Sequence, residues 1–129
     1  MIISTGVDLA EVERIKAALE RARTGRRFRT RVFTGQEIAY CESRGRGKYE
    51  SYAARFAAKE AVMKALGRGW GARVRWLDIE VQRTRSGKPE IALRGTTAQL
   101  AVELGIRDWA LSITHTKEHS LAFVIAQSE

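Results

Sequence analysis

The amino-acid sequence predicts an α+β domain in which helices, concentrated in the first half of the chain, pack on a largely antiparallel sheet. Two observations predict this class. Hydrophobic residues recur at helical spacing in the first half, and they alternate at strand spacing in much of the second. With 129 residues, 44% of them hydrophobic and 29% charged, the chain has the size and composition of one globular domain covering 1–129.

The first elements are a short strand that ends at Asp8 and a helix that follows at once. Asp8 with Glu11 three residues later matches a capping box, so Asp8 is a candidate N-cap. Val12 and Ile15 recur at helical spacing and are expected to face the core. The chain then turns at Gly25.

Three further helices are expected in the first half. A short one covers 26–32, and the next begins at Thr34, which acts as N-cap with Glu37 in the capping-box position. A long helix runs from about 50 to 66, rich in alanine and straight-chain residues, and Gly67 ends it.

The second half changes to strand periodicity. It is expected to contain strands at 76–82 and 90–93 joined by a hairpin-like turn at 83–89, a helix at 97–104, and strands at 109–114 and 121–126. Trp109, Leu111 and Ile113 alternate with the smaller residues Ala110, Ser112 and Thr114, which is typical of a strand with one buried face.

Composition excludes several classes of protein. No apolar run approaches the roughly 20 residues of a membrane span, and no signal peptide is recognisable. The single cysteine, Cys41, cannot form an internal disulfide, and it is expected to pack as a small hydrophobe. Together these observations point to the cytoplasm.

Positive charge is concentrated in one segment. Residues 14–31 hold eight basic residues and one acidic residue, a local charge of +7, whereas the whole chain carries +8. Such a block suggests a docking surface for an acidic partner, and the alternative is a solvated face that keeps the protein soluble.

The segment 55–67 carries the most informative side chains. Glu60 and Lys64 lie four residues apart on one face of the long helix. A carboxylate and an ammonium on one stripe can hold a metal ion and the phosphate that the metal binds, although surface ion pairs use the same spacing. Lys59 points to another face, as a surface or an interface lysine.

Four segments in order resemble the holo-acyl-carrier-protein synthase family, the small phosphopantetheinyl transferases. They are Gly6-Val-Asp-Leu-Ala-Glu-Val-Glu-Arg-Ile15, Phe33-Thr-Gly-Gln-Glu37, Arg55 to Gly67, and Ser112-Ile-Thr-His-Thr116. The resemblance spans nearly the whole chain. It implies transfer of the 4'-phosphopantetheine arm of coenzyme A to a serine of apo-acyl carrier protein, with release of 3',5'-ADP. It also implies the family fold and a homotrimer with active sites between subunits.

The resemblance assigns roles to the acidic residues. Asp8 and Glu60 match the family's two carboxylate ligands for Mg²⁺, an ion that prefers oxygen ligands and keeps several waters. Glu60 is also a candidate general base, directly or through a metal-bound water. Lys64 is expected to support the leaving phosphate, with a surface ion pair as its alternative.

Further residues are assigned to coenzyme A and to the carrier protein. Arg55 is expected to contact another phosphate of coenzyme A, for which the 3'-phosphate is a candidate. The strand end at 112–116 is expected to approach the pyrophosphate. The coenzyme A set is Arg55, Lys64, Gly87, Lys88, Pro89, Thr114, His115 and Thr116. Lys88 stands where the family usually has arginine, which keeps the charge but loses planar stacking. The docking set for the acidic carrier protein is Arg14, Arg21 and Arg23.

Two rival functions remain open. A nucleic-acid-binding module fits the arginine block but lacks a ladder of aromatic stacking residues and any known reading motif. A different magnesium-dependent phosphoester enzyme fits the same metal residues. The favoured interpretation involves neither nucleic acid nor membrane, and it leaves open whether the carrier belongs to fatty-acid or polyketide synthesis.

Overall fold

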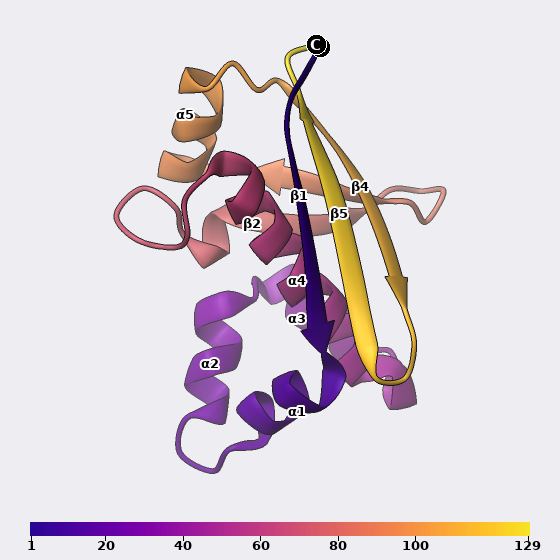
Figure 1. The fold of residues 1–129 in the computed structure, drawn as a ribbon. Coiled ribbons are helices and arrows are strands. Elements are labelled where there is room, and N and C mark those ends of the chain that lie inside the picture. Colours follow the sequence, from indigo (N-terminus) through magenta and orange to yellow (C-terminus); the bar gives the residue numbers. More distant parts are fainter.

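The computed structural model describes all residues from 1 to 129 and confirms the predicted α+β class. Figure 1 shows the order of the elements along the chain. Their bounds are β1 (Ile2–Glu11), α1 (Val12–Glu20), α2 (Gly25–Val32), α3 (Gly35–Glu42), α4 (Lys48–Leu66), β2 (Ile79–Arg83), β3 (Pro89–Leu93), α5 (Gly95–Glu103), β4 (Asp108–His115) and β5 (His119–Gln127). None of the helices combines the length and apolar character that crossing a membrane requires.

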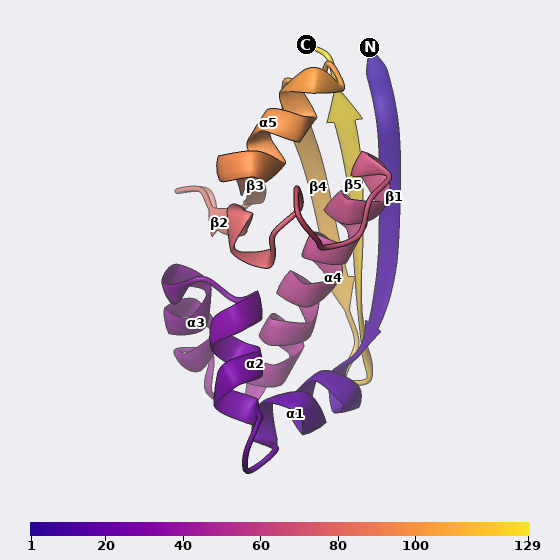
Figure 2. The same ribbon diagram turned by 90° about the vertical axis from the view of Figure 1, so that its left-hand side faces the viewer.

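The strands form two antiparallel sheets. The larger has the order β1-β5-β4, so β1 and β4 are its two edges, and β2 pairs with β3 as a hairpin. α4 lies along one face of the larger sheet, with α1, α2 and α3 around one end and α5 with the hairpin at the other (Figure 2). The opposite face of the larger sheet has no helix over it (Figure 1).

Small residues bring α4 close to the sheet. Ala57, Ala58 and Ala61 are fully buried in the core between the helix and the strands. In β1, a Cβ added at Gly6 would lie 1.9 Å from the carbonyl oxygen of Ala61, so this position has room for glycine alone. Asp8 is two residues further along β1 and therefore points to the same face, toward α4.

Replacing Gly6 with alanine is expected to lower the free energy of unfolding by about 1–3 kcal/mol, because the added methyl group forces β1 away from α4. Urea unfolding measures the change. Gly69→Ala is the matched control, since its added Cβ would have no neighbouring atom within 4 Å. Equal midpoints for the two variants would show that β1 and α4 are not packed this closely.

A buried ion pair joins the helices to the hairpin, and it corrects the interpretation of Lys59 as a surface or interface lysine. The Lys59 side chain is fully buried, and its Nζ lies 2.8 Å from Oε1 of Glu37. The same ammonium donates to the carbonyl oxygens of Val32 at 2.7 Å and Trp76 at 2.9 Å. Oε2 of Glu37 accepts from the amide of Val81 at 2.8 Å. Burial lowers the pKa of Lys59, while the Glu37 carboxylate opposes that shift.

The predicted start of the first helix at Asp8 is wrong. β1 continues through Asp8 to Glu11, because it pairs with β5 over that length, and α1 begins at Val12 without a side-chain cap. The capping box of Thr34 is confirmed, since its hydroxyl accepts from the amide of Glu37 and the Glu37 carboxylate accepts from the amide of Thr34. Cys41 is fully buried, and burial raises the pKa of its thiol to about 12, as expected of a packing residue.

Candidate active site

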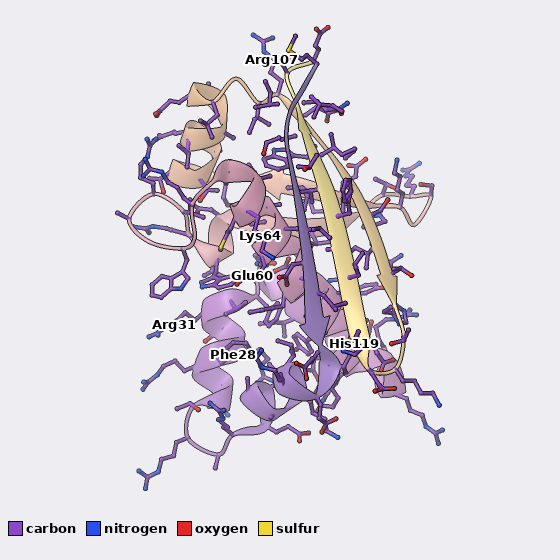
Figure 3. The ribbon with its side chains drawn as sticks, in the orientation of Figure 1. Phe28, Arg31, Glu60, Lys64, Arg107 and His119 are labelled. Atoms are coloured by element: carbon purple, nitrogen blue, oxygen red, sulfur yellow. The ribbon has the colours of Figure 1, made fainter.

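Asp8, Glu60 and Lys64 lie together between β1 and α4. The Nζ of Lys64 is 3.0 Å from Oδ1 of Asp8, and it also donates to the carbonyl oxygen of Val7 at 2.9 Å. Figure 3 shows Glu60 and Lys64 one turn apart on α4, beside β1. The Asp8 side chain is 17% exposed and that of Lys64 is 54% exposed, so the group faces solvent at one edge of the sheet.

Each charge in this group affects the others. Burial raises the pKa of Glu60, the carboxylate of Asp8 raises it further, and the ammonium of Lys64 acts in the opposite direction. Two carboxylates held this close repel each other, and a cation between them relieves the repulsion. In the chain alone, Lys64 is the cation that contacts Asp8.

The donor set fits a hard divalent ion that takes most of its ligands from outside the protein. No cluster of three or more His, Cys, Asp or Glu side chains is present that could enclose a metal ion. Asp8 and Glu60 offer two carboxylates at an accessible edge. Mg²⁺ is commonly bound by one or two carboxylates together with waters and substrate phosphates.

A second group of predicted residues lines a cavity of about 460 Å³ on the other side of α4. The cavity lies between α3, the first turns of α4, the β2–β3 hairpin and the end of β4. Among the predicted coenzyme A residues, Arg55, Pro89 and His115 line it. Sequence reasoning missed Tyr40 and Arg83, which also line it and reach it from distant segments.

The remaining predicted coenzyme A residues do not line this cavity. Gly87 forms the hairpin turn with a φ of 86°, and Lys88 beside it is exposed. Thr114 pairs with Leu121 and faces the uncovered side of the sheet. The hydroxyl of Thr116 accepts from the amides of residues 118 and 119 and so stabilises the β4–β5 turn.

α4 separates the two groups within one chain. Ser51 and Ala54 line the cavity together with Arg55, whereas Glu60 and Lys64 point toward β1. Ser51 and Glu60 are nine residues apart, which at about 100° per residue places them on opposite faces of the helix. Within one chain, the acidic residues lie together and the cavity residues lie together, but α4 keeps the two groups apart.

The predicted docking residues lie at the end of the molecule formed by α1 and the turn after it. Arg14 is exposed on α1, Arg21 follows its last residue, and Arg23 lies in the turn before α2. None of the three forms a salt bridge within the chain; of the basic block, Arg29 alone pairs, with Glu42. This end of the molecule consequently carries a net positive charge.

Comparison with known proteins identifies the family of the chain. The sequence profile of the 4'-phosphopantetheinyl transferase superfamily matches residues 4–124. The chain belongs to this superfamily. The matched range contains the positions of Asp8, Glu60 and Lys64 and those of the predicted coenzyme A residues.

Similar members of the 4'-phosphopantetheinyl transferase superfamily cover the whole length of the chain. The holo-[acyl-carrier-protein] synthase of Solibacter usitatus is 53% identical over 128 residues, which are 99% of this chain and 100% of that protein. The enzyme of the same name from Koribacter versatilis is 45% identical over 127 residues, covering 98% of this chain and 99% of the relative.

Solved structures share the fold. The holo-[acyl-carrier-protein] synthase of Neisseria meningitidis has a TM-score of 0.85 at 30% identity, with 98% of this chain and 99% of that chain covered. The synthase of Bacillus anthracis, crystallised in complex with CoA (3',5'-ADP), has a TM-score of 0.81 at 35% identity and covers 100% and 99% of the two chains.

Proposed function

We propose that the chain is a holo-[acyl-carrier-protein] synthase, which transfers 4'-phosphopantetheine from coenzyme A to a serine of apo-acyl carrier protein and releases 3',5'-ADP. The observation that carries this proposal is the convergence of Asp8, Glu60 and Lys64 between β1 and α4. Relatives of that name across the whole chain support it, as does the coenzyme A complex of the Helicobacter pylori synthase.

We further propose that the reaction depends on Mg²⁺, which Asp8 and Glu60 would hold. When bound, the ion neutralises the pyrophosphate of coenzyme A and stabilises the charge that develops as the phosphoanhydride bond breaks. The carboxylates of Asp8 and Glu60 fit this role because they are close together and accessible. Within the chain, Lys64 is the cation that partly balances their negative charge.

The other steps belong to the side chains themselves. The serine hydroxyl of the carrier attacks the phosphorus attached to pantetheine, a new O–P bond forms, and the bond to 3',5'-ADP breaks with its electron pair. Glu60 accepts the serine proton, directly or through a water molecule. Its raised pKa makes the carboxylate a stronger base, which suits this role. Lys64, whose side chain is half-exposed, supports the charge on the departing phosphate.

The basic end of the molecule suits an acidic carrier protein. Replacing Arg14 with glutamate is expected to raise the KM for carrier protein about tenfold at low salt, because the exposed arginine steers an acidic partner, and to leave the KM for coenzyme A unchanged. The difference should shrink as salt is added, since the charges are screened. Steady-state kinetics with each substrate varied in turn measure both KM values. An equal change in the two would show that Arg14 does not act in carrier-protein docking.

A homotrimer with active sites between subunits would unite the two groups of residues. The uncovered face of the β1-β5-β4 sheet supports association, since it exposes Val7, Leu9 and Phe123, which neighbour one another through the β1–β5 pairing. Contact between copies would bring the cavity of one chain to the acidic residues of another. Light scattering should give the mass of three chains; a monomeric mass in the active enzyme would exclude shared sites.

The direct test of the function is incubation with coenzyme A, Mg²⁺ and an apo-acyl carrier protein. Mass spectrometry should show a carrier heavier by one phosphopantetheine arm, together with an equal amount of 3',5'-ADP. A carrier whose acceptor serine is replaced by alanine provides the control. An unmodified wild-type carrier would rule out the proposal. Both proposed substrates are intracellular, and we therefore propose that the enzyme acts in the cytoplasm.

A further inference from the structure

The basic segment 14–31 contains one carboxylate, and that carboxylate pairs with none of the surrounding arginines. It belongs to Glu20, the last residue of α1. Glu20 lies next to Arg21 and three residues before Arg23, yet it forms no salt bridge. Its Oε2 instead accepts a hydrogen bond from the hydroxyl of Tyr49, in the first turn of α4. A neutral donor therefore holds the acid that neighbouring cations would be expected to attract.

Glu20 stands at a position that the helix itself disfavours. A carboxylate in the last turn meets the negative end of the helix dipole, and α1 has neither a basic residue in that turn nor a side-chain cap at its start. The arginines that follow are the natural partners for this charge. A residue that breaks a local rule and is held by one specific contact indicates a role beyond the stability of the helix.

Tyr49 contacts α1 on the side turned away from the predicted docking residues. The Nζ of Lys16 lies 5.4 Å from the centroid of the Tyr49 ring, while Glu20 accepts from the hydroxyl. Lys16 and Glu20 are one turn apart and share a face of α1. Arg14 and Arg21 share another stripe, about 130° away at 100° per residue. Binding of α1 through the first face leaves the second face free.

The Tyr49 hydroxyl is a dependable donor. Its hydrogen bond to the Glu20 carboxylate, with a further contribution from burial, raises the pKa of Tyr49 to about 12, so the phenol keeps its proton at physiological pH. The ring is also held from α4, since the Nζ of Lys48 lies 5.2 Å from its centroid and 3.3 Å from Oε1 of Glu42. The donor is therefore fixed in place before any partner arrives.

We propose that Tyr49 is a positioning residue for recognition of the carrier protein: its hydroxyl holds the Glu20 carboxylate away from Arg21 and Arg23, so that both stay available to an acidic partner. Without the hydroxyl, the carboxylate is released into the basic segment. There it pairs with these arginines and repels the acidic surface that they would bind. This inference rests on the proposed function for the identity of the partner.

The test is Tyr49→Phe, which keeps the ring and the net charge of the chain and removes only the hydroxyl. The KM for carrier protein is expected to rise about threefold at low salt, with little change in kcat or in the KM for coenzyme A. In the Glu20→Gln background the same replacement should have no effect, because no carboxylate is left to release. Tyr52→Phe is the matched control: it removes a hydroxyl bound to Glu42, outside the segment, and should leave the KM for carrier protein unchanged.

Two kinetic outcomes would overturn the inference. A rise in KM of equal size in the Glu20→Gln background would show that the hydroxyl merely anchors α1. A wild-type KM in Tyr49→Phe would show that the released carboxylate does not compete for the arginines.

Retention on immobilised poly-L-glutamate tests the same claim without turnover. Tyr49→Phe should elute at lower salt than the wild type, although the two carry equal charge, and Glu20→Gln should elute together with the double variant. Equal elution of Tyr49→Phe and the wild type would count against the inference. Failure of the proposed function is recognised separately, since the expected elution pattern without transfer to any carrier protein would support the role of Tyr49 and reject the reaction.

Discussion

Glu60→Gln is expected to lower kcat by about a thousandfold or more while leaving the fold intact, because it removes both a metal ligand and the proposed base. The fold should survive for two reasons. No hydrogen bond within the chain depends on the Glu60 carboxylate, and its pKa is raised by burial and by Asp8, so the charge is already unfavourable there. The neutral amide relieves that repulsion.

Release of 3',5'-ADP measures the activity of Glu60→Gln, and thermal unfolding measures its stability. Glu103→Gln is the control, since it removes one carboxylate from the exposed surface of α5, where the partner is Arg73. Wild-type turnover by Glu60→Gln would show that the Glu60 carboxylate is neither the base nor a required metal ligand. A large loss of stability would instead make it a structural residue.

Lys59→Met is expected to lower the free energy of unfolding by about 3–5 kcal/mol, because it leaves the fully buried carboxylate of Glu37 without its cation. The variant also leaves the carbonyl oxygens of Val32 and Trp76 without their donor. These two carbonyls and Glu37 come from the end of α2, the start of α3 and the turn before β2. Loss of the ammonium therefore loosens three connections to α4 at once.

Denaturant unfolding measures the effect of Lys59→Met. The double variant Lys59→Met/Glu37→Gln should recover part of the lost stability, since the buried charge is then absent from both sides. The single variant Glu37→Gln separates the contribution of the ion pair from that of the capping box at Thr34. A change below about 1 kcal/mol in Lys59→Met would mean that water reaches the pair.

Features governed by local sequence could be predicted. Thr34 and Glu37 form their capping box within one turn of helix, and Gly67 ends α4 with a φ of 77°, where glycine is favoured. The alternation around Leu111 predicted the buried face of β4. Each of these depends on neighbours within a few residues.

Features governed by distant contacts were predicted wrongly or missed. Asp8 has the spacing of a helix cap, but pairing of β1 with β5 extends the strand beyond it. Lys59 is buried because Glu37, 22 residues earlier, folds against it, and no helical pattern reveals that partner. Tyr40 and Arg83 meet only when the hairpin packs against α3 and α4.

The candidate site follows the same division. Glu60 and Lys64 share one face of α4 by spacing alone, and the sequence predicted this pair directly. Asp8 was linked to them by resemblance to a family, and the packing of Gly6 on Ala61 supplies the physical reason that β1 brings it there. The separation of the cavity from the acidic residues by α4 required the fold.

The central claim is that Asp8 and Glu60 hold one divalent ion beside the pyrophosphate of coenzyme A. A crystal of the enzyme soaked with coenzyme A and Mn²⁺, whose anomalous signal locates the ion, tests it most directly. The account predicts one strong peak bound by both carboxylates, with Lys64 moved from Asp8 to a phosphate oxygen and the ribose phosphate at Arg55. An ion coordinated elsewhere, with Lys64 still paired to Asp8, would contradict it.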